Sequence, residues 1–339
     1  MATENNEAVF PITSSLDYWG QKTLDEIKKR TYVDPLYDPG FKAFLGDEKA
    51  LVSFLNGVFH LKDDRKITSV TIKNPEINII FPETKNFKLD IRATTANGIC
   101  INVEMQKARP PHFADRIVLQ NSAFTLLSKY EWNQSLGELP PNPTDKERAE
   151  REARRYEIPP VYTIWICDFK VARQDSYRGN WTIRNEKGLT LNDKVMYIIY
   201  DLTQFNKPLE EIKTNEDRWL YLLKHAGKAE SLPDFGDDII AKAIRRILVK
   251  AAPEKLLKEQ ADDMVLTEEQ LDHLAWLKVN AENKLRAEGR AEGITEGANC
   301  KAREMAAKML AKDKPVDEIA EFTGLSESEI LAIKAGTAQ

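Results

Sequence analysis

The sequence predicts a layered α/β core followed by a helical C-terminal region. Three observations lead to this fold class. Segments rich in β-branched residues stand between segments of helical period from about residue 41 to residue 169. Their order is helix, three strands, helix, strand, which is typical of an α/β layered core. From about residue 209 onward, the apolar spacing is almost entirely helical.

The first long helix is predicted over residues 41–61, where large apolar residues recur at helical spacing. A turn-rich stretch, YVDPLYDPGF, precedes it. Gly46 interrupts the apolar pattern, so we expect the helix to break there. Before the turn-rich stretch, we expect a polar leader that ends in the short amphipathic helix TLDEIKKR.

Three predicted strands follow, each rich in β-branched residues and separated from the next by turn signals. They are ITSVTIKNPEINII, NFKLDIRATT and GICINVEMQ. The next segment, FADRIVLQNSAFTLLSKYEW, has a helical period. PPVYTIWICDF is then a nearly continuous apolar run of strand length, which indicates a strand buried on both faces.

A charged insertion bounded by prolines separates the second helix from this last strand. It reads PPNPTDKERAEREARRYEIPP. The simpler interpretation is a solvated surface helix. The alternative is a DNA-facing patch formed by its arginines, and the glutamates that alternate with them argue against it. The arginines are Arg148, Arg151, Arg154 and Arg155.

The C-terminal region contains a four-residue glycine repeat and a two-helix tail. Gly289, Gly293 and Gly297 are one helical turn apart, which predicts either a flexible tether or a close helix–helix contact. In the tail, Ser326 and Glu329 form a capping-box pattern before the second helix. The tail resembles a helix-turn-helix, but its second helix is acidic, so we favour an assembly role over base reading.

Composition is that of an ordinary globular protein, with 42% apolar and 30% charged residues. We expect no secretory signal and no membrane span, because neither an N-terminal apolar run nor a span of about 20 apolar residues is present. The scattered Cys100, Cys167 and Cys300 indicate reduced thiols in a cytoplasmic protein. The formal net charge of -5 argues against a broadly basic nucleic-acid-binding surface.

The residues that carry chemistry lie on a predicted hairpin between residues 88 and 106. Side chains alternate across a strand, so each strand presents its odd-numbered apolar residues on one face and its even-numbered polar residues on the other. A three-residue loop, Ala96-Asn97-Gly98, pairs even positions with even positions and places glycine at the left-handed position. In this register Asp90 lies opposite Glu104, and Lys88 lies opposite Gln106.

Two facing carboxylates at about 5 Å repel each other and destabilise a sheet. A divalent cation such as Mg²⁺ compensates, because it binds one or two carboxylates and keeps several waters. Such an ion activates a water and stabilises charge on a phosphoryl group. The alternative is that Lys88 and Arg92 neutralise the pair on a solvated face. Glu48, on the first helix, is a candidate third acidic ligand, although an exposed glutamate on a helix is the ordinary case.

Together these segments resemble the PD-(D/E)XK nuclease superfamily and, more narrowly, the recombination-promoting nuclease/transposase family. The resemblance covers roughly residues 31–205. It rests on the order and spacing of YVDPLYDPGFKAFLG, VSFLNGVF, KLDIRATTANGICINVEMQ, FADRIVLQNSA and PPVYTIWICDF. It implies a restriction-endonuclease-like αβββαβ core, within a chain divided into residues 1–30, 31–205, 206–284 and 285–339. These parts are the polar leader, the nuclease-like domain, a helical extension, and the glycine-punctuated helix with its two-helix tail.

The resemblance implies Mg²⁺-dependent cleavage of DNA phosphodiester bonds, with Mn²⁺ as an alternative ion. Asp90 and Glu104 would be the metal ligands, and Gln106 stands where the superfamily usually has a catalytic lysine. A neutral amide orients the attacking water and donates to phosphate, but it supplies no charge. Leu89 replaces the proline that gives the superfamily its name.

The candidate DNA-binding residues are Lys88, Lys107, Arg109, Arg116 and Gln120. Arg116 and Gln120 are one helical turn apart and face the same way. An arginine begins this helix in the family, which implies a phosphate contact, whereas the tyrosine pair that usually follows is absent here. Lys88 shares the face of the carboxylates in the predicted register. Lys107 and Arg109 flank the site, where the alternative for both is ordinary surface charge.

The predicted function is therefore a metal-dependent DNA endonuclease, a hydrolase acting on phosphodiester bonds. The alternative is a catalytically weak or inactive nuclease-fold protein that binds DNA or a partner, which the acidic net charge and Gln106 favour. A third hypothesis is an assembly protein with a vestigial core. We expect DNA as the partner and homo-oligomer formation through the C-terminal helices, with no membrane contact and no organic cofactor.

Overall fold

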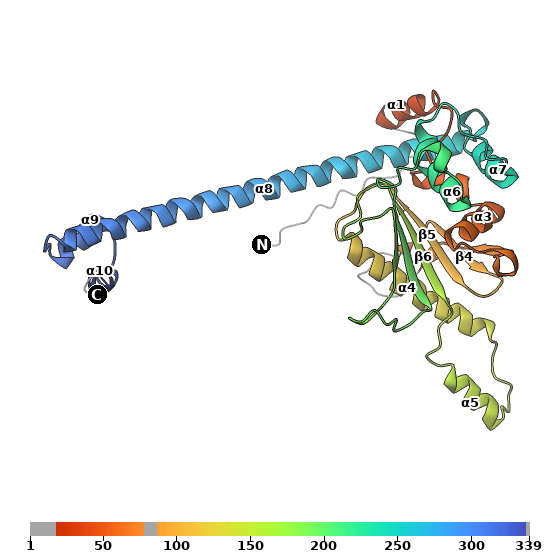
Figure 1. Ribbon diagram of the computed structural model, residues 1–339, viewed down its shortest axis with the longest axis horizontal. Coiled ribbons are helices and arrows are strands. Elements are labelled where there is room, and N and C mark those ends of the chain that lie inside the picture. Colours follow the sequence, from red (N-terminus) through yellow and green to blue (C-terminus); the bar gives the residue numbers. More distant parts are fainter. Residues whose placement is uncertain (1–17, 78–86, 337–339) are drawn as a thin grey trace, which may run out of the picture. The chain divides into compact units, whose positions relative to one another are not determined.

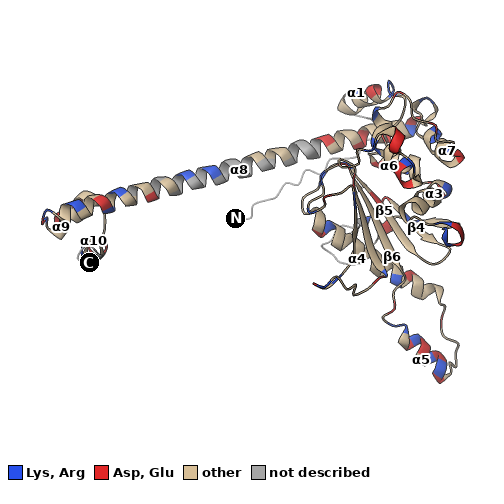
Figure 2. Cartoon of the chain, in the orientation of Figure 1, with Lys and Arg blue, Asp and Glu red and all other residues tan. Residues whose placement is uncertain are grey.

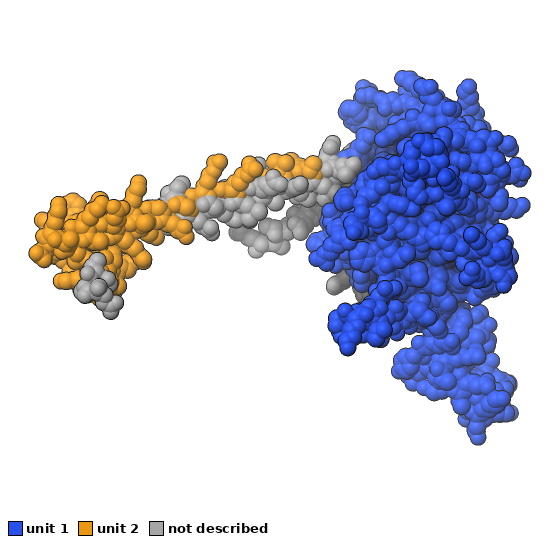
Figure 3. Space-filling view, in the orientation of Figure 1, with its two compact units in different colours: residues 1–268 blue, residues 269–339 orange. Residues whose placement is uncertain are grey.

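The computed structural model describes residues 18–77 and 87–336. The chain divides into two compact units, residues 1–268 and residues 269–339, which Figure 3 shows in different colours. Each unit is described by itself below. The predicted boundaries at residues 30, 205 and 284 stay predictions.

A mixed six-stranded sheet forms the centre of the first unit, in the order β1-β4-β5-β6-β8-β7 (Figure 1). The strands β1, β4 and β5 form antiparallel pairs, β5, β6 and β8 run parallel, and β7 is antiparallel to β8. The bounds are β1 Val70–Lys73, β4 Ile91–Thr95, β5 Cys100–Gln106, β6 Val161–Cys167, β7 Arg178–Trp181 and β8 Val195–Asp201. A separate two-stranded sheet pairs β2, Glu76–Ile77, with β3, Phe87–Lys88.

The predicted α/β, restriction-endonuclease-like fold with C-terminal helices is confirmed. Strand β6 is central in the sheet and almost wholly buried, as its continuous apolar sequence predicts. The edge of the sheet beyond β6 was not predicted, and it consists of β8 and β7. The burial of β8 increases toward its C-terminal end, where Ile198–Asp201 are buried.

Helices cover both faces of the sheet (Figure 1). On one face, α3, Glu48–Val58, and α6, Asn215–His225, contribute Phe54 and Trp219 to the main apolar core together with Val103. On the other face, α4, Phe113–Ser135, packs Phe124 against Cys100 and Val161. The even-numbered side chains of β5, including the candidate catalytic ones, therefore lie beneath α4.

The first predicted long helix breaks at the expected place. α2, Asp38–Leu45, ends at Gly46, and α3 begins after Asp47. The Asp47 side chain accepts a hydrogen bond from the Ala50 amide at 3.1 Å, which caps the new helix. The short helix before the turn-rich stretch is α1, Tyr18–Ile27.

The charged insertion forms α5, Asp145–Ala153, and no residue of this helix is buried. Thr144 and Glu147 close a capping box at its start. Figure 2 shows acidic and basic residues interleaved along α5. This is the solvated surface helix of the simpler interpretation, and the DNA-facing alternative has no feature of its own to support it.

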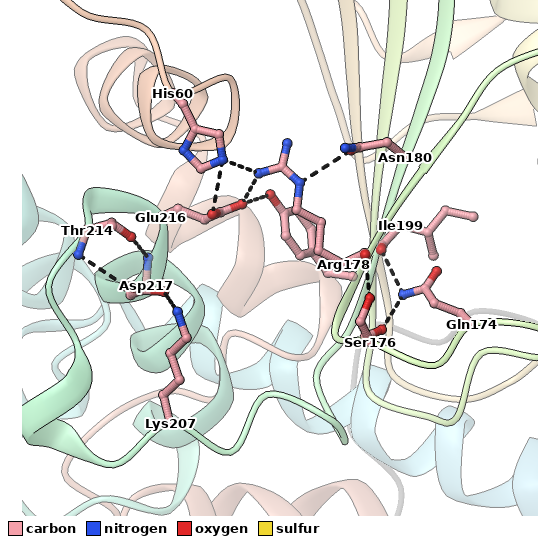
Figure 4. A network of polar contacts seen from close by, with 11 residues as sticks. His60, Gln174, Ser176, Arg178, Asn180, Ile199, Lys207, Thr214, Glu216 and Asp217 are labelled. Atoms are coloured by element: carbon pink, nitrogen blue, oxygen red, sulfur yellow. Dashed lines mark hydrogen bonds and ion pairs between the residues drawn. The ribbon is translucent and has the colours of Figure 1, made fainter.

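A network of polar contacts connects the β7 edge of the sheet to α6 and to the turn after α3 (Figure 4). Arg178 of β7 forms an ion pair with Glu216 of α6, and its Nη1 lies 2.8 Å from His60 Nε2. The buried Tyr200 hydroxyl donates to the same Glu216 carboxylate. These contacts join β7 and β8 to α6 and to the turn that follows α3, and they lie on the face of the sheet opposite to α4.

Helix α7, Asp238–Arg246, precedes the long helix α8, Glu254–Leu310. α8 begins in the first unit and continues without a break through the glycine repeat. A Cβ atom built at Gly293 or Gly297 meets no atom within 4 Å, so no close helix–helix contact forms at these two glycines within the part of the chain that the structure describes. Among the described residues, no helix is long and apolar enough to cross a membrane.

The second unit ends in the predicted two-helix tail. α9, Val316–Thr323, ends at Gly324, whose φ of 70° is left-handed, and α10 spans Glu327–Gly336. The Ser326 amide donates to Glu329 Oε2 at 2.9 Å, and the Glu329 amide donates to Ser326 Oγ at 3.4 Å. Apolar residues from α8, α9 and α10 form a small core of their own.

Candidate functional site

The hairpin that carries the site has the predicted loop and register. Gly98 has a φ of 79°, and the Thr95 amide donates to the Ile99 carbonyl across the three-residue loop. The pairing runs from Thr94 opposite Cys100 to Ile91 opposite Val103. One step further along the same register, Asp90 comes to lie across from Glu104.

The backbone pairing of β4 with β5 stops before Asp90. There the Asp90 side chain accepts a hydrogen bond that a backbone carbonyl would otherwise accept. In a continued ladder the Met105 amide would donate to the Leu89 carbonyl. Instead it donates to Asp90 Oδ2 at 2.7 Å. The Asp90 amide in turn donates to Glu104 Oε1 at 3.3 Å. These two bonds fix the Asp90 carboxylate beside Glu104.

Glu104 is only 1% exposed, although a glutamate is rarely buried without a partner. Among the described residues, its Oε2 atom has no hydrogen-bond partner. The same is true of the Asn102 amide, of Gln120 Nε2 and of Nε1 in Trp165, the residue beside Glu104 on β6. Several buried polar atoms without partners around one carboxylate indicate a place for water or an ion.

Burial raises the pKa of both carboxyls, and neighbouring charge raises it further. For Glu104 the second cause is Asp90, and its pKa lies well above the usual range. The side-chain amides of Asn102 and Gln120 lower the pKa of Glu104, although neither forms a hydrogen bond of ordinary geometry. The pKa of Asp90 rises to about 7 through burial and then through the charge of Asp38.

Asp38 is a site residue that the sequence interpretation missed. It begins α2, and its carboxylate accepts from Lys42 Nζ at 2.8 Å. Its negative charge raises the pKa of Asp90. Glu48, the acidic candidate on the first helix, instead lies exposed in the first turn of α3. The sequence did contain a signal, because Asp38, near the end of the turn-rich stretch, stands four positions before Lys42 and can pair with it.

Gln106 and Lys107 follow Glu104 on the chain, and both side chains make other contacts. Gln106 Nε2 donates to the Met105 carbonyl at 2.9 Å. Lys107 Nζ forms an ion pair of 2.6 Å with Asp168 and lies 5.5 Å from the centre of the Tyr37 ring. Neither side chain is directed at the carboxylates in this conformation.

The predicted position of Lys88 is wrong. Lys88 pairs with Glu76 in the two-stranded sheet instead of lying opposite Gln106. The chain has already left the ladder at Asp90, so the extrapolated register no longer applies. The hypothesis that Lys88 and Arg92 neutralise a solvated pair also fails. Arg92 pairs with Glu131 and donates to the Asn74 carbonyl, and Glu104 is buried.

Arg116 and Gln120 lie on α4, on the side that faces the carboxylates. Gln120 is 1% exposed, and its side-chain amide lowers the pKa of Glu104. Arg116 is exposed, and its charge lowers the pKa of Asp90. Both predicted helix residues thus lower the pKa of a carboxyl of the pair. Arg109 lies exposed after β5.

The donor set fits a small, hard cation better than a softer metal. Among the described residues, no group of three or more histidine, cysteine, aspartate or glutamate side chains is arranged to hold a metal. Two carboxylates, one with a buried oxygen lacking a partner, remain. Mg²⁺ accepts one or two carboxylates and keeps its other ligands as water. In the described part of the chain, Cys100, Cys167 and Cys300 are free thiols.

Comparison with known proteins identifies the family of the chain. A family model described as PD-(D/E)XK nuclease family transposase matches residues 35–126 and 144–277, which is more than half of the chain. The match includes Asp90, Glu104 and Gln106, and it extends beyond residue 205 through the first turns of α8. No curated protein and no solved structure matched the chain. The chain belongs to the PD-(D/E)XK nuclease family of transposases.

Proposed function

We propose that this protein is a Mg²⁺-dependent DNA endonuclease that hydrolyses phosphodiester bonds. One observation carries the proposal: the Glu104 carboxylate is buried beside Asp90 with one oxygen that has no partner among the described residues. Membership in a nuclease family gives the second support.

A buried Glu104 carboxylate beside the half-buried Asp90 carboxylate is costly in a purely structural role. A buried charge is strongly unfavourable unless it is paired or binds a metal. Arg116 is exposed and Lys42 is held by Asp38, so neither neutralises the pair from inside the protein. A divalent ion would remove the cost, and the buried oxygen of Glu104 would then be a ligand.

In the proposed site Asp90 and Glu104 bind Mg²⁺, with Mn²⁺ as the alternative ion. When bound, the ion supplies an activated water and neutralises charge on the phosphoryl group. The Met105 amide fixes the orientation of Asp90. Gln106 would orient the attacking water once its amide leaves the Met105 carbonyl, and the buried amide of Gln120 lowers the pKa of Glu104.

Arg116 is the proposed phosphate contact nearest to the metal site. It is exposed, and its charge reaches Asp90. Lys107 would contribute to DNA binding only after exchanging its ion pair with Asp168 for a phosphate. Lys88 and Arg109 are exposed on the surface, where they would add to binding by charge alone.

The second candidate function is a nuclease-fold protein that binds DNA or a partner without cutting. Two observations favour it: Gln106 gives the site no positive charge, and α4 covers Glu104. Self-association through the C-terminal helices stays a prediction for either function. The exposed Phe322 and Leu331 in the tail support it, and light scattering of the full chain tests it.

Cleavage of supercoiled plasmid distinguishes the two functions. We expect nicking with Mg²⁺ that disappears in EDTA, in Asp90→Ala and in Glu104→Gln. Asp175→Asn removes an exposed aspartate elsewhere and is the matched control. Equal cleavage by all four proteins would identify a contaminant or another site. Folded wild type that cuts nothing would support the non-cutting binder.

A further inference from the structure

The first turn of α2 carries Asp38, and its backbone amides need acceptors from outside the helix. The first N–H groups of any helix lack partners within it. Here Tyr37, the residue before the helix, provides no side-chain cap, and Pro39 has no N–H group. The amides of Asp38 and Gly40 are therefore the two donors that must be satisfied.

The first turns of α8 supply both acceptors. The Asp38 amide donates to Asp263 Oδ2 at 3.0 Å, and the Gly40 amide donates to Gln260 Oε1 at 2.9 Å. Gln260 Nε2 also donates to the Asp34 carbonyl at 3.1 Å. Helix α2 is thus capped by side chains that follow it by more than 200 residues.

The packing around these bonds leaves little freedom. Gln260 is completely buried, so its amide requires both of its partners. A Cβ atom on Gly40 would lie 2.2 Å from the Asp34 carbonyl oxygen and 3.0 Å from Gln260 Oε1. Leu257, Ala261 and Met264 belong to the main core, so the base of α8 is itself anchored.

We propose that Gln260 and Asp263 are positioning residues of the nuclease site, which fix the first turn of α2 and its Asp38 carboxylate by capping the helix from α8. The start of α2 is close to the end of β5, because the ring of Tyr37, the residue before Asp38, lies 5.5 Å from Nζ of Lys107, three residues after Glu104. The proposal rests on the proposed function of the Asp90–Glu104 pair. Gln260 and Asp263 act through Asp38, which forms an ion pair of 2.7 Å with Lys42. When a divalent ion is bound, the Asp38 carboxylate would be a further acceptor for the waters that such an ion keeps. The first turns of α8 therefore help to position the side chains of the site.

The test compares Asp263→Ala with Asp263→Asn, which keeps an oxygen acceptor for the Asp38 amide. Lys258→Ala, an exposed change on the same helix, is the matched control. Two quantities are measured on the full chain: amide hydrogen exchange of the peptide that contains Asp38 and Gly40, and Mg²⁺ affinity by calorimetry. The first does not depend on activity.

We expect Asp263→Ala to accelerate exchange at Asp38 by about five-fold, the factor that loss of one cap implies. Mg²⁺ binding should weaken by up to the same factor. In Asp263→Asn, amide exchange at Asp38 and Mg²⁺ affinity should both be close to the wild-type values. Lys258→Ala should not differ from wild type in either quantity. A merely structural cap would change exchange but not Mg²⁺ affinity, and that result would overturn the proposal, as would unchanged exchange.

Failure of the proposed function is distinguishable from failure of this inference. Wild-type protein that binds no Mg²⁺ and cuts no DNA overturns the function, and that result is visible before any variant is made. Wild-type protein that binds Mg²⁺, beside an Asp263→Ala variant with unchanged affinity, overturns only the positioning role. A loss of Mg²⁺ affinity in Gln260→Ala would support the positioning role independently.

Discussion

Replacing Asp90 with asparagine should stabilise the metal-free protein while abolishing the proposed activity. The substitution removes one negative charge from the Asp90–Glu104 pair but keeps an oxygen that accepts from the Met105 amide. Burial, and then the charge of Asp38, raise the pKa of Asp90 from 3.8 to about 7. The ionised carboxylate is therefore unfavourable in the folded protein when no cation is bound.

The direction and size of the effect follow from this pKa. The folded protein retains the Asp90 proton at pH values where the unfolded chain has lost it, so wild-type stability falls as the pH rises from about 4 to about 7. A rise of about three pH units at about 1.4 kcal/mol each gives an upper bound of about 4 kcal/mol. Because Asp90 is partly exposed, screening reduces the expected gain to about 2 kcal/mol.

Urea unfolding in EDTA at pH 4 and pH 8.5 measures this gain. We expect Asp90→Asn and wild type to have similar free energies of unfolding at pH 4, and the variant to be the more stable at pH 8.5. Asp175→Asn, on the surface, should change neither value. A variant that is no more stable than wild type at pH 8.5, or equally stabilised at both pH values, would refute the reasoning.

Three further predictions concern the site and the network of Figure 4. Mg²⁺ affinity should fall as the pH drops below about 7, because protons compete for Asp90; a calorimetric titration with pH-independent affinity would contradict this. Arg116→Ala should move the acidic limb of the pH–rate profile upward, since Arg116 lowers the pKa of Asp90; an unmoved limb would exclude that role. Glu216→Ala should cost about 3 kcal/mol in urea unfolding, because Arg178 loses its buried partner; a loss below about 1 kcal/mol would show the network to be dispensable.

Local patterns predicted the parts of the fold that depend on neighbouring residues. The alternation of β4 and β5 and the loop ending at Gly98 determine the hairpin register, which the structure confirms up to Ile91 and Val103. The break at Gly46 follows from one residue in a helical pattern. In each case, the determining residues lie within a few positions of the feature they determine.

The missed features depend on contacts between distant parts of the chain. The pairing of Lys88 with Glu76 reflects a small second sheet, which alternation in a single hairpin does not reveal. Glu104 is buried because α4 covers its face of the sheet, so a side chain expected on a polar face has no access to solvent. Asp38 joins the site through the packing of α2, whose first turn is capped from α8.

The central claim, that Asp90 and Glu104 form a divalent cation site, is tested most directly by Mn²⁺ binding followed by electron paramagnetic resonance. The account predicts tight Mn²⁺ binding by wild type, competition by Mg²⁺, and loss of the site in Asp90→Asn and in Glu104→Gln. Equal binding by wild type and both variants would contradict it, because the ion would then be held by other residues.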